Sequence, residues 1–311
     1  MTSLIVGGGG FLGRNLAGLL LSEGQSVRIF ERTGYDHSQF PLHRQIEWQY
    51  GDYSRPEDIS SALQNVDVVY LFASTTTPKT SNDNFSYDIE SNLVATVSFL
   101  EIASKHEIRK IIFPSSGGTV YGIPGNTPIS EAHSNHPICS YGINKLAIEK
   151  YLALFERQHG LDYTVLRISN PYGPYQSVNS GQGVVANFLY KVLNNEEIEI
   201  WGDGSTIRDY VYVADVARAL LQASGNNSGQ RIFNVGSGIG YDLNEILLHI
   251  EQIAGKKARR RYVAGRLLDV PINILDIGKA RQLLDWTPSY TLHEGLEATA
   301  NWLYNQTPSK K

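Results

Sequence analysis

Short apolar runs alternate with helical patterns along the first half of the chain. The apolar runs are rich in Val, Ile, Leu and aromatic residues, and they read SLIVG, SVRIF, IEWQYGD, VDVVYLFAS, RKIIFPSS and DYTVLRIS. Runs of this kind are typical of strands buried on both faces, and the helical segments between them favour parallel connections. The pattern therefore predicts an α/β fold, a doubly wound parallel sheet with helices on both faces.

The alternation becomes less regular after about Arg167, where loops rich in Gly and Pro begin. Two later strands, near residues 209–215 and 231–236, are expected to return to the first sheet. We therefore divide the chain into a first domain over residues 1–166, joined by those two strands, and a smaller C-terminal α/β region mainly over residues 167–311.

Glycines cluster directly after the first predicted strand. Gly7, Gly10 and Gly13 form a G-x-x-G-x-x-G pattern before a helical segment. Bare main chain permits a tight turn, close approach of a pyrophosphate and tight packing of the helix on its strand. The helix N-terminus then offers free N–H groups to phosphate. Glu31 comes directly after the second predicted strand, where a carboxylate can bind the adenosine ribose, so the sequence predicts a Rossmann-type dinucleotide site.

The second and third strands also bear on the choice of dinucleotide. Glu31 would repel a 2′-phosphate, which favours NAD, but Arg32 can pair with such a phosphate and leaves NADP open. Asp52, in YGDY after the third strand, suits a contact to the adenine amino group. An ordinary turn aspartate is the alternative interpretation of Asp52.

Tyr141 and Lys145 are four residues apart at the start of a predicted helix, so they lie on one face. An ammonium beside a phenol favours the phenolate. Bringing a tyrosine pKa from about 10 towards 7 requires roughly 4 kcal/mol, which we expect from Lys145 and an oxidised nicotinamide together. Tyr141 would then act as a base at neutral pH.

The ordered motifs resemble the extended short-chain dehydrogenase/reductase family, and in particular its nucleotide-sugar 4-epimerases of the UDP-galactose 4-epimerase type. The resemblance covers nearly the whole chain. Its motifs read GGGGFLG, GDYSRPEDI, VVYLFAS, SSGGTVYG, SYGINKLAIEKYL, LRISNPYGPYQ, WGDGSTIRDYVYVADVARAL, FNVGSGIGYDLNEIL and GRLLDVPINILDIGKARQLLDW.

This resemblance implies a tightly bound NAD and a nucleotide sugar lying between the two regions of the chain. Tyr141 would take the proton of the sugar 4-hydroxyl while C4 gives hydride to the nicotinamide. The 4-keto sugar would then turn over and receive hydride on its other face. Lys145 would lower the tyrosine pKa and hold the nicotinamide ribose. The expected substrate is UDP-glucose/galactose or an N-acetylated analogue, in polysaccharide biosynthesis.

One position departs from the family pattern. Gly117 stands where the family usually carries its catalytic Ser or Thr, and Ser116 and Thr119 flank it. We predict that Ser116 supplies the hydroxyl, with Thr119 as the alternative. Gly118 and Thr119 also replace the Asp-Glu pair of the 4,6-dehydratases, so the acid and base for removing water are missing.

The resemblance implies further binding residues. The other expected contacts to the cofactor are Phe11, Leu12, Tyr53, Phe72, Ala73, Ser74 and Asn92. The expected contacts to the nucleotide sugar are Ser116, Thr119, Asn170, Gly183, Val184, Trp201, Arg208, Arg266 and Asp269. Guanidinium groups suit the diphosphate because they present paired donors and keep their charge. Asn273 lies near a position where strict glucose/galactose epimerases carry a bulky tyrosine, so a larger sugar is an alternative.

Two other functions stay open at this stage. A nucleotide-4-keto-6-deoxysugar reductase using NAD(P)H is the first, because Gly117 leaves the hydroxyl geometry unsettled. The second is a non-catalytic NAD-binding sensor or scaffold, against which the Tyr141 and Lys145 pair argues.

Composition narrows the possible partners. The net charge is −4, with a pI near 6.1, and the longest basic run is KKARRR. We therefore expect no nucleic-acid partner. Cys139 is the only cysteine and the eight histidines show no metal-ligand spacing, so we expect neither a disulfide nor a metal site.

The location and assembly of the protein are also predicted. With no basic n-region and no run of about 18 apolar residues, we expect a cytoplasmic protein without membrane insertion. The helical segments SNLVATVSFLEIASKH and KLAIEKYLALFERQ carry apolar stripes. Their family counterparts form an intersubunit four-helix bundle, which implies a homodimer.

Overall fold

Seven parallel strands form the central sheet of the computed structural model, which describes residues 1–38, 40, 42–178, 183–265 and 270–306. Their order across the sheet is β10-β6-β5-β4-β1-β2-β3. The strands are β1 (Thr2–Val6), β2 (Ser26–Glu31), β3 (Ile46–Tyr50), β4 (Val68–Leu71), β5 (Lys110–Ser116), β6 (Tyr163–Ile168) and β10 (Ile232–Val235). All six strands predicted in the first half of the chain are present, and the predicted Rossmann-type fold is confirmed.

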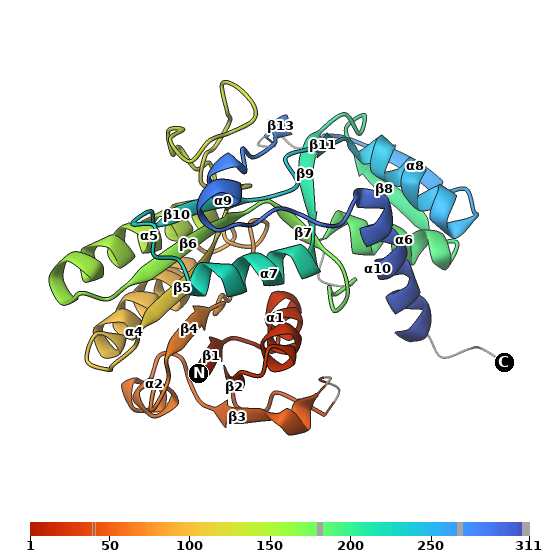
Figure 1. Cartoon of the computed structure of the whole chain (residues 1–311). Coiled ribbons are helices and arrows are strands. Elements are labelled where there is room, and N and C mark those ends of the chain that lie inside the picture. The colour runs from red at the N-terminus through yellow and green to blue at the C-terminus, as the bar shows by residue number, and fades with distance from the viewer. Residues whose placement is uncertain (39, 41, 179–182, 266–269, 307–311) are drawn as a thin grey trace.

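Helices cover both faces of this sheet (Figure 1). One face packs against α1 (Phe11–Ser22), α7 (Val213–Ser224) and α9 (Gly278–Leu283). The other packs against α2 (Pro56–Ala62), α4 (Ala95–Ala103) and α5 (Ser140–His159). Because both faces are covered, the strands are apolar throughout rather than alternating.

The strand order reverses between β1 and β4, so their carboxyl ends lie side by side. Gly7 follows β1 with a positive φ of 74°. A Cβ on Gly7 would lie 3.0 Å from the Cα of Ala73, which follows β4. Ligands of open α/β sheets bind at such a reversal, so the fold itself indicates where a cofactor would lie.

The segment before α4 is irregular and contributes to the same end of the sheet. A single turn of helix, α3 (Phe85–Asp88), runs into a π-helical turn, η2 (Ile89–Val94), and then into α4. A 3-10 turn, η1 (His43–Gln45), precedes β3. π-Helical turns within helices are frequent at functional sites.

A smaller region lies beside the carboxyl ends of the sheet (Figure 1). One of its sheets contains β7 (Asn170–Tyr172), β9 (Ile207–Tyr212), β11 (Gly240–Tyr241) and β13 (Ile272–Asn273). The other pairs β8 (Glu197–Trp201) with β12 (Arg259–Val263). Its helices are α6 (Val184–Leu193), α8 (Leu243–Ala254) and α10 (Leu292–Gln306). They share an apolar cluster with β8 and β9.

One of the two strands expected to return to the first sheet does not do so. The strand near 231–236, β10, pairs with β6. The strand near 209–215 begins earlier, as β9, and pairs with β7, β11 and β13 instead. The place beside β6 is taken by β10, while Tyr210 and Tyr212 of β9 are buried in the cluster of the smaller region. This part of the domain prediction was therefore wrong.

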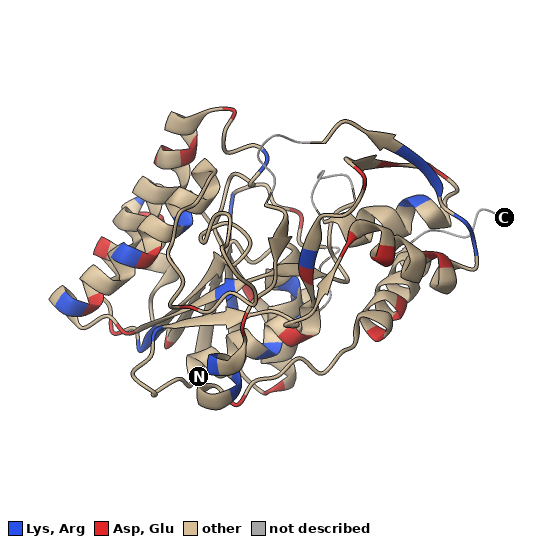
Figure 2. Ribbon diagram, turned by 90° about the horizontal axis from the view of Figure 1, so that it is seen from above, with Lys and Arg blue, Asp and Glu red and all other residues tan. Residues whose placement is uncertain are grey.

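Charged residues of both signs are interspersed over the molecule in Figure 2. The run of three arginines begins β12, where Arg261 pairs with Glu197 at 2.8 Å and also with Glu199, both on β8. Arg260 pairs with Glu251 at 2.7 Å. The basic run thus helps to hold its own strand in place. No helix among the described residues is long and apolar enough to cross a membrane.

Candidate active site

The glycine loop holds the first turn of α1 close to β1. A Cβ on Gly13 would lie 2.3 Å from the carbonyl oxygen of Gly8, so only glycine permits this packing. Gly10 is the N-cap, and a Cβ there would meet nothing nearer than 4.0 Å. Phe11 and Leu12 are the first residues of the helix. The free N–H groups of this turn form the predicted phosphate site.

Glu31 lies at the glycine loop, as predicted. One carboxylate oxygen accepts a hydrogen bond from the Gly9 N–H at 3.0 Å, and the other accepts from the Arg32 N–H at 3.1 Å. Arg32 itself is exposed. The structure therefore brings the carboxylate and the phosphate site together, which is the arrangement that a bound adenosine ribose requires.

Asp52 and Tyr53 have local partners. Asp52 accepts hydrogen bonds from the Ser54 N–H and hydroxyl at 2.8 and 2.7 Å, and these bonds lower the pKa of its carboxyl. The Tyr53 ring stacks on Phe99 with centroids 5.7 Å apart. These are a turn and a packing contact, and the predicted contacts of both residues to the cofactor stay predictions.

A small pocket lies where the chain leaving β4 meets α5 and the π-helical turn. It is lined by Ala73, Ser74, Asp88, Asn92, Tyr141, Asn144, Lys145 and Ile148. Five of these were predicted from the sequence, although they come from three separate segments. Phe72 precedes them and packs into the core beneath the sheet.

Lys145 is almost completely buried, with 7% of its surface exposed. Its Nζ donates a hydrogen bond to the Pro114 carbonyl at 3.0 Å and lies 5.5 Å from the centre of the Tyr141 ring. Burial lowers the pKa of Lys145 to about 8, and the nearby Glu149 opposes this effect. The ammonium form still predominates at neutral pH.

The pKa of Tyr141 moves in the opposite direction from the one predicted. Burial raises it to about 12, with smaller contributions from Cys139 and Asp88. In a buried site the desolvation of a phenolate outweighs the attraction of an ammonium beyond the ring. In the protein alone, the phenol is therefore protonated, and Lys145 by itself does not make it a base.

The end of β5 carries the departure from the family pattern. A Cβ on Gly117 would lie 2.5 Å from Leu275 Cδ1 and 3.1 Å from the Arg167 carbonyl oxygen, so a side chain there would require Leu275 to move. Ser116 is half-buried. The Thr119 hydroxyl is buried and has no hydrogen-bond partner among the described residues. The choice between these two hydroxyls stays a prediction.

The predicted contacts to the nucleotide sugar lie in the smaller region. Asn170 and Arg208 are on the neighbouring strands β7 and β9, where Asn170 donates to the Asp209 carbonyl at 3.1 Å and Arg208 to the Ile207 carbonyl at 2.8 Å. Trp201 ends β8 and is 44% exposed.

Of four further predicted residues, two are described and two are not. Gly183 caps α6 with a φ of 79°, and Val184 is the first residue of that helix. Arg266 and Asp269 lie outside the described residues.

Sequence reasoning missed three polar residues that belong to the pocket or border it. Ser140 and Asn144 each donate a buried hydrogen bond to the same carboxylate oxygen of Asp88. Asp88 and Asn92 are four residues apart, and so are Ser140 and Asn144, which places each pair on one helix face. That repeated spacing was the available signal.

The residues present suit a dinucleotide. The glycine loop leaves main chain free for a pyrophosphate, the Glu31 carboxylate lies against that loop, and the pocket with Tyr141 and Lys145 lies farther along the same edge of the sheet. Bound NAD supplies a reversible hydride acceptor at such a pocket. No group of three or more His, Cys, Asp or Glu in the described parts of the chain is placed to hold a metal ion.

The chain is similar along nearly its whole length to two UDP-glucose 4-epimerases. A UDP-glucose 4-epimerase of Thermotoga maritima, solved with UDP-glucose, is 34% identical, with a TM-score of 0.93 and coverage of 98% of this chain and 99% of that one. A UDP-glucose 4-epimerase of Mycolicibacterium smegmatis is 31% identical over 99% of this chain and 100% of its own length.

A third similarity concerns a different reaction. A dTDP-4-dehydro-6-deoxyglucose reductase of Escherichia coli is 33% identical over 94% of this chain and 95% of its own length. The model of the family described as "NAD dependent epimerase/dehydratase family" matches residues 3–236. The chain therefore belongs to the NAD dependent epimerase/dehydratase family.

Proposed function

We propose that this protein is an NAD-dependent nucleotide-sugar 4-epimerase, which inverts C4 of its substrate through a transient 4-keto sugar. The observation that carries the proposal is the pocket in which Tyr141 and Lys145 meet the chain leaving β4, beside the glycine loop. A phenol in that position can exchange a proton with a secondary alcohol held over the cofactor.

Tyr141, Lys145 and Ser116 have different roles in the proposed reaction. Tyr141 accepts the proton of the sugar 4-hydroxyl and returns it after the keto sugar has turned over. Lys145, fixed by the Pro114 carbonyl, keeps its positive charge in the pocket and would hold the nicotinamide ribose of the cofactor. Bound NAD would supply a second positive charge near Lys145, and the two charges together would lower the pKa of Tyr141 from its value in the protein alone. Ser116 supplies the hydroxyl that holds the sugar oxygen.

The substrate that relatives favour is UDP-glucose, with UDP-galactose as its 4-epimer. The Thermotoga maritima structure contains UDP-glucose, and a similar structure is a UDP-N-acetylglucosamine 4-epimerase of Methanobrevibacter ruminantium. We therefore propose UDP-glucose first and the N-acetylated sugar second. The Asn273 side chain is fully buried and donates to the Gly117 carbonyl at 3.1 Å, so it gives no support to a widened sugar pocket.

The similarity to a 4-keto sugar reductase gives a second candidate. A reductase consumes one NAD(P)H for each sugar, whereas an epimerase consumes none. The test incubates the purified protein with UDP-glucose and separately with a dTDP-4-keto-6-deoxysugar plus NADPH, following sugar products and nicotinamide absorbance. UDP-galactose formed without net change in the cofactor supports the proposal, and stoichiometric loss of NADPH with the keto sugar would overturn it.

We propose that the protein forms a homodimer through α4, α5 and the π-helical turn. Apolar side chains on this surface are exposed, among them Val94, Ile143, Tyr151 and Leu154. Packing these helices against their copies would bury them. Light scattering at micromolar concentration should give twice the chain mass, and Leu154→Asp should give a monomer; a wild-type monomer contradicts the proposal.

We propose a cytoplasmic location. The chain contains one cysteine, which is unpaired, and the proposed cofactor and nucleotide sugar are made inside cells. Cell fractionation tests this, since the activity should appear in the fraction released without detergent.

A further inference from the structure

Asp88 is a fully buried carboxylate at the wall of the active-site pocket, and the mechanism above does not use it. Its exposed fraction is 0%. It ends α3, where the chain enters the π-helical turn, and it lines the same pocket as Tyr141 and Lys145. A buried carboxylate needs several donors to remain in place.

Four side chains supply those donors from three segments. One Asp88 oxygen accepts from Thr76 Oγ1 and from Asn92 Nδ2, the latter at 2.9 Å. The other oxygen accepts from Ser140 Oγ at 2.6 Å and from Asn144 Nδ2 at 2.8 Å. The four contacts are shared two to each oxygen, so both carboxyl oxygens of Asp88 have partners.

The two contacts from Asp88 to α5 are made next to the two reactive side chains. Ser140 immediately precedes Tyr141, and Asn144 immediately precedes Lys145. Asp88 thus holds the turn of α5 that carries both reactive side chains. On its other side it holds Asn92, whose amide oxygen accepts from the Thr75 N–H at 2.9 Å and so ties the π-helical turn to the chain leaving β4.

We propose that Asp88 is a positioning residue for the proton transfer at Tyr141, acting through Ser140 and Asn144 to hold the first turn of α5 against the cofactor-binding edge of the sheet. This inference rests on the proposed function. Asp88 also acts by its charge, since it disfavours the phenolate of Tyr141. Cys139, before the helix, also disfavours the phenolate, and the Nζ of Lys145 lies 5.5 Å from the centre of the Tyr141 ring.

The test compares wild type with Asp88→Asn, using Asp83→Asn on the exposed chain before α3 as the matched control. For D88N with NAD and UDP-glucose we expect kcat to fall about tenfold with KM within about twofold, because geometry rather than binding is lost. The acid limb of the kcat/KM profile should move to lower pH by roughly half a unit, because a negative charge has been removed.

A second readout does not need turnover. The ultraviolet titration of tyrosinate, recorded as the difference between each protein and the same protein carrying Tyr141→Phe, isolates the Tyr141 phenol. Its midpoint should fall in D88N and stay unchanged in D83N. If wild type does not invert UDP-glucose, the proposed function fails, and this titration still tests the role of Asp88.

A milder variant covers the case in which D88N does not fold. Ser140→Ala removes one contact and keeps the charge, so we expect kcat to fall about threefold with the Tyr141 titration unmoved. A D88N protein with kcat within twofold of wild type, an unmoved Tyr141 titration, or an S140A protein with unchanged kcat would overturn the proposal.

Discussion

Two buried lysines contact opposite ends of strand β5, and their surroundings differ. Lys110 begins the strand, is 1% exposed, and pairs with Asp162 at 3.1 Å while donating to the Asn226 carbonyl. Lys145 contacts the other end through the Pro114 carbonyl and lies over the ring of Phe113 at 4.6 Å. The first lysine has a carboxylate partner, and the second is held by a neutral carbonyl and aromatic rings.

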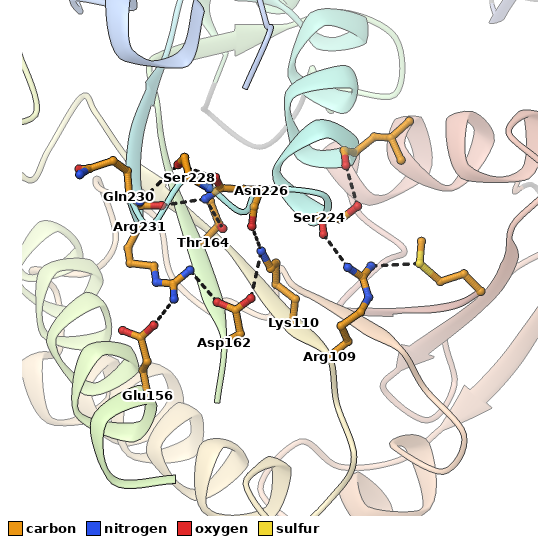
Figure 3. A network of polar contacts seen from close by, with 12 residues as sticks. Arg109, Lys110, Glu156, Asp162, Thr164, Ser224, Asn226, Ser228, Gln230 and Arg231 are labelled. Carbon is orange, nitrogen blue, oxygen red and sulfur yellow. Dashed lines mark hydrogen bonds and ion pairs between the residues drawn. The ribbon is translucent and has the colours of Figure 1, made fainter. Parts of the chain in front are cut away.

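Lys110 belongs to a network of hydrogen bonds and ion pairs that stabilises the fold (Figure 3). Asp162 also pairs with Arg231 at 2.7 Å, and Arg231 pairs in turn with Glu156 of α5. Asn226 donates to Thr164 Oγ1 at 3.2 Å. These contacts join the amino ends of β5, β6 and β10. At the carboxyl ends, burial opposes the charge of Lys145 and the ionisation of Tyr141, so that site is built for reactivity at a cost in stability.

If the carboxyl ends of the strands hold the reactive site, removing the Tyr141 hydroxyl should have the largest effect on activity. Tyr141→Phe should lower kcat about a thousandfold, because the proton acceptor is lost, while the melting temperature stays within about 2 °C. The measurement is the rate of UDP-glucose inversion together with thermal unfolding. Retained NAD binding is the control, and a rate within tenfold of wild type would contradict the assigned role.

Replacing Lys110, at the amino end of β5, should lower stability and leave activity nearly unchanged. Lys110→Met leaves the Asn226 carbonyl buried without its donor and removes an ion pair, so the free energy of unfolding should fall by about 3 kcal/mol. Denaturant unfolding measures this, and Lys105→Met on the exposed surface is the matched control. KM and kcat should stay within twofold, and a loss of activity without a loss of stability would reverse our assignment of the two ends.

Lys145→Met should stabilise the protein at pH 7 while abolishing most activity. The folded pKa is about 8 and lies below that of the unfolded lysine, so folding at neutral pH must accommodate a disfavoured ammonium. Removing the charge should outweigh the lost hydrogen bond to the Pro114 carbonyl, so the free energy of unfolding should rise by about 2 kcal/mol.

The sign of the pH dependence follows from the same shift. As pH rises from about 8 towards 10.5, the folded lysine loses its proton while the unfolded one still holds it, so wild-type stability should increase. The advantage of K145M should therefore shrink over that range. An advantage that stays constant from pH 7 to 9.5 would show that the lysine charge is not the cause.

The smallest effect is expected at Glu31, the carboxylate predicted to bind the adenosine ribose. Glu31→Gln should raise the Kd for NAD about tenfold, because a charged acceptor is replaced by an amide. Asp52→Asn is the comparison, since Asp52 is occupied by Ser54 in its own turn. Calorimetry with NAD measures both, and equal losses would indicate that Asp52 contacts the adenosine after all.

The sequence predicted the six strands of the first half because both of their faces are buried, which leaves continuous apolar runs. It did not predict β12, which reads RRRYV, because three arginines resemble a surface segment until Glu197 and Glu199 are placed beside them. It also placed β9 in the wrong sheet, since a strand pattern does not state its partners.

The site was predictable to the extent that its signals are local. Tyr141 and Lys145 follow from a spacing of four, and the glycines from their place after a strand. Asp88 was missed because its contacts to Ser140 and Asn144 join positions more than fifty residues apart. The rise in the pKa of Tyr141 was missed for a related reason, because burial depends on the whole fold.

The most direct test of the central claim, that hydride leaves and returns to C4 within this pocket, is the fate of a label at that carbon. UDP-glucose carrying deuterium at C4 should give UDP-galactose that keeps the deuterium at C4, with none lost to water. Inversion accompanied by loss of the label, or no inversion by the NAD-loaded protein, would contradict the account.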